Sequence, residues 1–153
     1  MKSSIHAIAA SIAMLCIAIF WTSSLVAEVF LDNAAVVVVK HAIAMYGLAV
    51  LVSVMAITGA SGFALGKQRK GRLVDQKKMR MRYIALTGLL VMIPSALYLY
   101  SKSAVGQFDT LFYVVQVIEL CAGLVQLSLM SLNFRDGLKL AGKLRAKKDG
   151  TSE

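Results

Sequence analysis

One carboxylate, Glu119, stands near the middle of an apolar stretch long enough to cross a membrane, FYVVQVIELCAGLVQLSLMSLNF. An α-helix turns by about 100° per residue, so polar neighbours at the right spacing share the face of Glu119 over an arc of about 100°. The residues within this arc are Gln116, Glu119, Gly123, Gln126, Met130 and Asn133. The other positions are mostly aliphatic or aromatic, which predicts a helix with one face toward protein and the rest toward lipid.

The chemistry open to Glu119 follows from its surroundings. An ionised carboxylate in hydrocarbon costs about 2.5–3.5 kcal/mol, so this side chain must be protonated, paired or hydrated. Burial favours the protonated acid, whereas a nearby Lys40 or His41 would favour the carboxylate. Glu119 can therefore join helices through hydrogen bonds, or it can bind a proton, a cation, a polar ligand or a quinone head group.

Depth along each helix predicts which polar side chains meet this acid. Glu119 lies about 12 Å inside the nearer membrane surface at about 1.5 Å per residue. Lys40 and His41 would lie above this layer and would reach it only by leaning inward. The predicted intramembrane polar site comprises Glu119, Gln116, Gln126, Tyr46, Ser95 and Thr22.

Four apolar blocks must position these residues. Hydrophobic residues make up 58% of the 153 residues, above the roughly 45–50% of soluble domains. A span of the hydrocarbon core needs about 20 apolar residues, and the predicted spans are 5–29, 38–65, 83–101 and 109–134. We therefore expect an all-α transmembrane bundle of four helices over 1–134, with a basic loop at 66–82. The basic tail 135–153 has Leu138, Ala141 and Leu144 on one face, which predicts a short amphipathic helix on the membrane surface.

The first block is a candidate signal peptide because Lys2 precedes it. It is longer than the roughly 7–15 residues of a signal-peptide core, so we expect it to remain as a span. Fifteen of the seventeen Lys and Arg residues fall on one side of the predicted spans, and only Lys40 and Lys102 fall on the other. The positive-inside rule then predicts that both termini and the loop 66–82 are cytoplasmic. In this respect the chain resembles small bacterial inner-membrane proteins with four spans.

The net charge of +9 also bears on partners. Cations near a membrane surface attract anionic lipid headgroups, and those predicted to do so are Lys67, Arg69, Lys70, Arg72, Lys77, Lys78, Arg80 and Arg82. Nucleic acid is not an expected partner, because the basic segment has neither interleaved aromatic residues nor a recognisable binding module.

Glycine spacing predicts close helix packing. Gly59, Gly62 and Gly66 recur on one face of the second span, and Gly123 lies on the polar face of the fourth. Glycine lets another backbone approach closely in a membrane. Packing inside the bundle is the simpler interpretation of the three glycines in the second span, and a homodimer face is the alternative.

The motifs of common catalytic sites are absent from the sequence. It contains no HExxH, GxSxG or P-loop pattern, so we expect neither an enzyme nor a metal site. His6 and His41 fall at opposite ends of their spans, roughly 30 Å apart, which argues against one haem held within a single chain. Cys16 and Cys121 each lie inside a span and do not indicate a disulfide framework.

These patterns favour a non-enzymatic accessory or scaffold subunit of a membrane complex, or a homodimer. Its contact surfaces would be the fourth helix and the glycine face of the second. A small proton- or cation-coupled transporter that uses Glu119, Gln116 and Gln126 is the alternative. A haem- or quinone-binding electron-transfer subunit is a weaker one.

Overall fold

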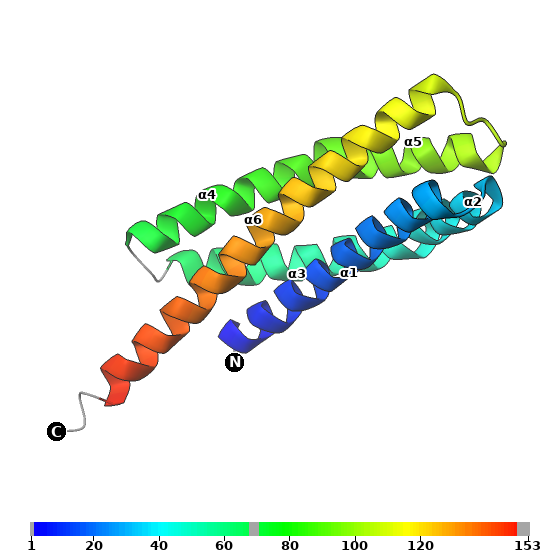
Figure 1. The fold of residues 1–153 in the computed structure, drawn as a ribbon. Helices are drawn as coiled ribbons and strands as arrows, with labels where there is room; N and C mark the ends of the chain where they lie inside the picture. The colour runs from blue at the N-terminus through cyan, green and yellow to red at the C-terminus, as the bar shows by residue number, and fades with distance from the viewer. Residues whose placement is uncertain (1, 68–70, 150–153) are drawn as a thin grey trace.

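The computed structural model describes residues 2–67 and 71–149, which form helices joined by short turns (Figure 1). Four helical rods are long and apolar enough to cross a membrane. The elements in chain order are α1 (Lys2–Phe30), α2 (Asn33–Ala42), η1 (Ile43–Gly47), α3 (Leu48–Lys67), α4 (Arg72–Thr87), η2 (Gly88–Met92), α5 (Ile93–Ala104) and α6 (Thr110–Asp149). The second rod is α2–η1–α3 and the third is α4–η2–α5.

The rods run up and down, so two ends of the bundle can be defined. The start of α1, the junction of α3 with α4 and the end of α6 lie at one end, which we call the basic end (Figure 1). The connections 31–32 and 105–109 lie at the other, which we call the distal end. Helix α1 packs against α2, α3 and α6, while α6 also packs against α4 and α5. The helix that carries Glu119 therefore packs mainly against the first and third rods.

The turn between α1 and α2 forms as its residue types predict. The Asp32 carboxylate accepts a hydrogen bond of 2.9 Å from the Ala35 backbone N–H and so caps α2. The run of β-branched residues after it, Val36–Val39, is helical. An α-helix pairs the backbone N–H and C=O groups with one another within the segment, whereas an open strand edge in lipid would leave them without hydrogen bonds. This run therefore lies in the first helix of the second rod.

Two π-helical turns interrupt the second and third rods. In η2 the Ile93 N–H bonds the Gly88 carbonyl, five residues back, directly before Pro94. Proline has no N–H for the usual bond to the fourth preceding residue, so the wider turn adjusts the backbone there. In η1 a Cβ on Gly47 would lie 2.5 Å from Cζ of Phe20, so a larger residue at this contact with α1 would require the Phe20 ring to shift.

Two apolar clusters hold the rods together along their length. The distal cluster consists of Ala27, Val36, Leu99 and Phe112, and the central cluster consists of Ala13, Ile17, Ile84 and Met130. Lipid tails are as apolar as these side chains, so close packing rather than escape from water stabilises such clusters in a bilayer. Along α6, Glu119 falls between Phe112 of the distal cluster and Met130 of the central one.

The structure differs from the predicted elements at the basic end. The segment 66–82, predicted to be a loop, is mostly helix, because α3 extends to Lys67 and α4 begins at Arg72. Its Arg, Lys, Leu, Met and Gln residues are good helix formers. The tail does not form a separate helix either, since α6 continues without a break from Thr110 to Asp149 (Figure 1).

Candidate functional site

Glu119 forms a buried ion pair with Lys40. Lys40 Nζ lies 2.6 Å from Glu119 Oε2, and the exposed fractions of the two side chains are 2% and 10%. The same ammonium donates a hydrogen bond of 3.3 Å to Ser24 Oγ. The contact joins α1, α2 and α6, and it replaces two isolated charges, each costly inside a bundle, with a neutral pair.

Lys40 enters the site because of its position on α2. It follows Val36 by four residues, so the two side chains share a face, and Val36 packs into the distal cluster. The apolar stem of lysine can then lie along that cluster while the ammonium reaches a neighbouring helix. The sequence placed Lys40 above the polar layer; the structure puts its ammonium within it.

The polar face of α6 is turned into the bundle. Six of six residues in the predicted arc are buried, and these are Gln116, Glu119, Gly123, Gln126, Met130 and Asn133. Several amide atoms on this face are buried without a hydrogen-bond partner: both polar atoms of Gln116, Oε1 of Gln126 and Oδ1 of Asn133. Helix α6 therefore brings more hydrogen-bonding capacity inside than the other rods satisfy.

Ser95 is buried in α5, but two other predicted members of the polar site lie elsewhere. Thr22 is exposed and donates its hydroxyl to the Ala18 carbonyl of its own helix at 2.7 Å. It precedes the buried Ser24 by two residues, which places it about 200° round the helix. Tyr46 is 69% exposed, and its ring packs edge-on against His41. Depth alone did not predict which face of each helix turns inward.

Three residues of α1 that the prediction left out contribute to this region. Ser24 accepts the bond from Lys40, and Glu28, one turn further on, interacts electrostatically with both Lys40 and Glu119. Trp21 Nε1 donates a hydrogen bond of 2.8 Å to the Leu120 backbone carbonyl of α6. Spacing could have indicated Ser24, because it lies seven residues after Ile17, on the face that packs into the central cluster.

The four glycines predicted to pack differ in their surroundings. A Cβ on Gly123 would lie 2.8 Å from Cδ1 of Trp21, and one on Gly62 would lie 3.0 Å from Cε1 of His6, so both allow close contacts. Gly59 is exposed, and a Cβ there would have no neighbour within 4 Å, so it does not pack inside the bundle. Gly66 lies among the residues whose surroundings the structure does not describe.

The cations of the basic segment have several environments. Arg80 Nη1 forms an ion pair of 2.6 Å with Asp136 Oδ2 of α6, so its charge is already matched within the chain. Arg72, Lys78 and Arg82 are exposed along α4, and Lys77 is partly buried, close to Gly137. The predicted headgroup contacts of Lys67, Arg69 and Lys70 fall on side chains outside the described residues.

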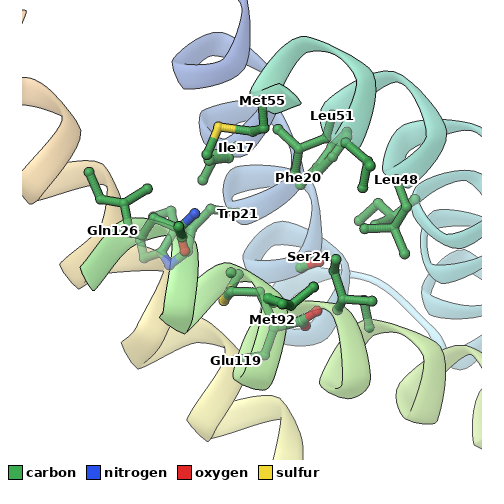
Figure 2. A pocket seen from close by; sticks show the side chains of 18 of the residues that line it. Ile17, Phe20, Trp21, Ser24, Leu48, Leu51, Met55, Met92, Glu119 and Gln126 are labelled. Atoms are coloured by element: carbon green, nitrogen blue, oxygen red, sulfur yellow. The ribbon is translucent and has the colours of Figure 1, made fainter. Parts of the chain in front are cut away.

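A pocket of about 360 Å³ opens beside the ion pair (Figure 2). It lies among α1, the η1–α3 segment, the α4–η2–α5 rod and α6. Leu48, Leu51 and Met55 of α3 line one side, and the polar side chains that reach it include Ser24, Glu119 and Gln126 (Figure 2). The pocket is apolar apart from a few polar groups, which is the usual composition of a small-molecule site.

The side chains that could ligate a metal or a haem iron lie in separate surroundings in the described part of the chain. Within residues 2–67 and 71–149, no three His, Cys, Asp or Glu side chains come together as a metal site. His6 Nδ1 lies 3.1 Å from the Thr58 carbonyl of α3, whereas the His41 ring lies 5.5 Å from that of Tyr100. The carbonyl can only accept, so His6 carries its proton on Nδ1.

Comparison with protein-family models, curated proteins and solved structures finds no match for the chain.

Proposed function

We propose that this protein is a non-enzymatic accessory or scaffold subunit of a membrane complex. It would lie in a bacterial-type inner membrane with both termini in the cytoplasm. The start of α1 and the end of α6 share the basic end with the junction of α3 and α4, so one orientation places the clustered cations on one side (Figure 1). Cations on the cytoplasmic side agree with the positive-inside rule and would face anionic lipid.

The Lys40–Glu119 ion pair is the observation that carries this proposal. A carboxylate that serves a transport cycle must release its partner to take up a proton or cation. Here Glu119 is held by a lysine of the same chain, and a serine of a third helix bonds that lysine. Such a contact specifies which helices associate and in which register, which is the role expected of a scaffold.

The outer surface of α3 offers a place for a partner helix. Small residues recur there every three or four positions and are exposed; they are Ala49, Ser53, Ala56 and Ala60. The Ser53 hydroxyl bonds the Ala49 carbonyl of its own helix at 2.8 Å, so it does not need a polar partner. Small residues at this spacing let a second helix approach closely in lipid. This small-residue stripe, rather than the polar face of α6, is the expected contact surface.

Photo-crosslinking in native membranes tests the proposal. A benzophenone amino acid at position 60 lies on the stripe, and the same probe at position 90 replaces the exposed Leu90 of the third rod. We expect one discrete adduct at position 60 and none at position 90. An adduct of two chains of 16.5 kDa would identify a homodimer, and any other mass would identify a different subunit. A chain that stays uncrosslinked at both positions would contradict the accessory role.

Proton- or cation-coupled transport is the second candidate, because Glu119 contacts Lys40 through Oε2, and no described residue forms a hydrogen bond with its Oε1. The double variant Lys40→Met/Glu119→Leu separates the two functions. For a scaffold, the variant keeps its position-60 adduct, and ion flux in liposomes is the same with and without the substitutions. Ion flux that occurs with the wild type and is absent with the double variant would establish transport instead.

A further inference from the structure

The pocket beside the ion pair is open to the surroundings of the bundle between two rods. Val52 and Ala56 of α3 line it from one side, and Ala85 and Leu89 line it from the third rod; all four side chains are exposed. Ser24, Glu119 and Gln126 line it as well, and these are buried. A molecule dissolved in the membrane could therefore enter sideways and meet polar groups only at the inner end.

The inner end has unused hydrogen-bonding capacity. Gln126 is 4% exposed, and its Oε1 is buried without a partner. The carboxylate of Glu119 meets Lys40 through Oε2, which leaves Oε1 as a second acceptor without a hydrogen bond in the described part of the chain. A buried polar group without a partner costs about 1–3 kcal/mol, so an occupant that bonds these groups is favoured over an acyl chain.

The charge balance of this end selects against an ionic occupant. Lys40 and Glu119 neutralise each other at 2.6 Å, and Glu28, the other acid near them, does not line the pocket, so a charged head group would meet no unpaired opposite charge in the pocket lining. A hydroxyl has one O–H, which it can donate to Oε1 of either Glu119 or Gln126, and its own oxygen can accept a hydrogen bond from the amide nitrogen of Gln126. The apolar walls fit a hydrocarbon body, and about 360 Å³ is at the lower end of ordinary ligand pockets.

We propose that this pocket binds a neutral membrane amphiphile, with its hydroxyl head group against Glu119 and Gln126 and its hydrocarbon body between α3 and the third rod. The two π-helical turns support a binding role, because residues of both line the pocket: Ile43 of η1, and Gly88 and Met92 of η2. Such turns are often found at functional sites. All the lining residues belong to one chain, so the pocket can be tested without a partner subunit, although Ala56 at its mouth also belongs to the small-residue stripe.

Photolabelling of the purified chain in liposomes tests the site directly. The probes are hexadecanol with a diazirine on its chain, the matching diazirine alkane without a hydroxyl, and the matching trimethylammonium compound. We expect the alcohol to label pocket residues saturably, with competition by unlabelled hexadecanol. The alkane and the ammonium compound should label the same residues only weakly.

Matched variants show whether the polar groups at the inner end and the residues at the mouth of the pocket are needed for binding of the alcohol. Gln126→Leu should lower the apparent affinity for the alcohol about three- to tenfold, as expected for one lost hydrogen bond. Gln116→Leu is the control, because Gln116 lies on the same buried face of α6 outside the pocket. Ala85→Phe should block the mouth and abolish saturable labelling, while Leu86→Phe, at an exposed residue that does not line the pocket, should not.

Three results would overturn the proposal. Equal, non-saturable labelling by alcohol and alkane would mean that the pocket holds bulk acyl chains only. Stronger labelling by the ammonium compound would mean that the occupant is cationic. Labelling that survives Ala85→Phe would place the bound alcohol elsewhere. None of these results would alter the crosslink expected at position 60, so the two proposals fail separately.

Discussion

Two ion pairs of α6 have the same N–O distance but differ in the exposure of the cation and in the charges around it. Lys40–Glu119 and Arg80–Asp136 both have an N–O distance of 2.6 Å. The acids lie roughly 25 Å apart along the helix at about 1.5 Å per residue. The exposed fraction is 2% for the Lys40 side chain and 23% for that of Arg80. The distance between the charges therefore says little about what each pair does.

The neighbouring charges explain the difference. Asp136 has a second cation within reach, since Arg135 Nε lies 3.8 Å from its Oδ1, and partly exposed Arg80 has alternatives in solvent or lipid headgroups. Lys40 is buried in the distal half of the bundle, where its ammonium hydrogen-bonds to Glu119 and to no other described acid. Loss of one partner is therefore tolerable at the basic end and severe beside the pocket.

Removing one member of the buried pair should have the largest effect. Lys40→Met leaves Glu119 buried without a cation, and we expect the free energy of unfolding to fall by about 3–5 kcal/mol. The double variant Lys40→Met/Glu119→Leu should recover most of this loss, because an apolar pair can replace a buried ion pair at little cost. Unfolding of the purified protein in SDS measures both. Additive losses in the double variant would show that the two charges act independently.

Gly123→Val should have the next largest effect. Its side chain would meet the Trp21 indole, and overpacking of this kind costs about 1–3 kcal/mol. The chain has one tryptophan, so a change in its fluorescence reports displacement of the indole directly. Gly59→Ala is the control: it has open space around it and should stabilise α3 by up to about 1 kcal/mol. Unchanged fluorescence in Gly123→Val would mean that the new side chain is accommodated without moving the Trp21 indole.

Asp136→Asn should have a smaller effect than Lys40→Met. Because Arg80 is partly exposed, we expect a loss of about 1 kcal/mol or less, shrinking as salt is added. The comparison is made by SDS unfolding at low and high salt. A loss as large as that of Lys40→Met would mean that burial does not distinguish the two pairs.

The exposed pair at the distal turn should have the smallest effect. The hydrogen bond from Lys102, and then that from the Phe112 backbone N–H, hold the pKa of Asp109 below its ordinary value of 3.8. A lowered folded-state pKa stabilises the turn above the unfolded pKa, and this contribution disappears as pH falls through the folded value. Between about pH 5 and pH 3, the melting temperature of Asp109→Asn should therefore fall less with decreasing pH than that of the wild type. Identical pH profiles would contradict this assignment.

The periodic features of the sequence were enough to identify the rods and one of their faces. Hydropathy located four spans, Asp32 marked the start of α2, and spacing on α6 identified six residues that are all buried. These properties are local, because a helix fixes the angle between its own side chains whatever lies around it. The same reasoning could not orient the first and second rods, where Thr22 and Tyr46 lie outside the polar site.

The tertiary structure alone decided what meets the polar face of α6. Lys40 rather than Tyr46 reaches Glu119, and the indole of Trp21 fills the space that Gly123 leaves open. Each contact depends on how a rod is rotated about its axis and where a π-turn shifts that rotation, and packing against other rods sets both. The sequence determined which side chains α6 would turn inward; the arrangement of its neighbours decided whether they would be paired, as Glu119 is, or left open beside a pocket, as Gln126 is.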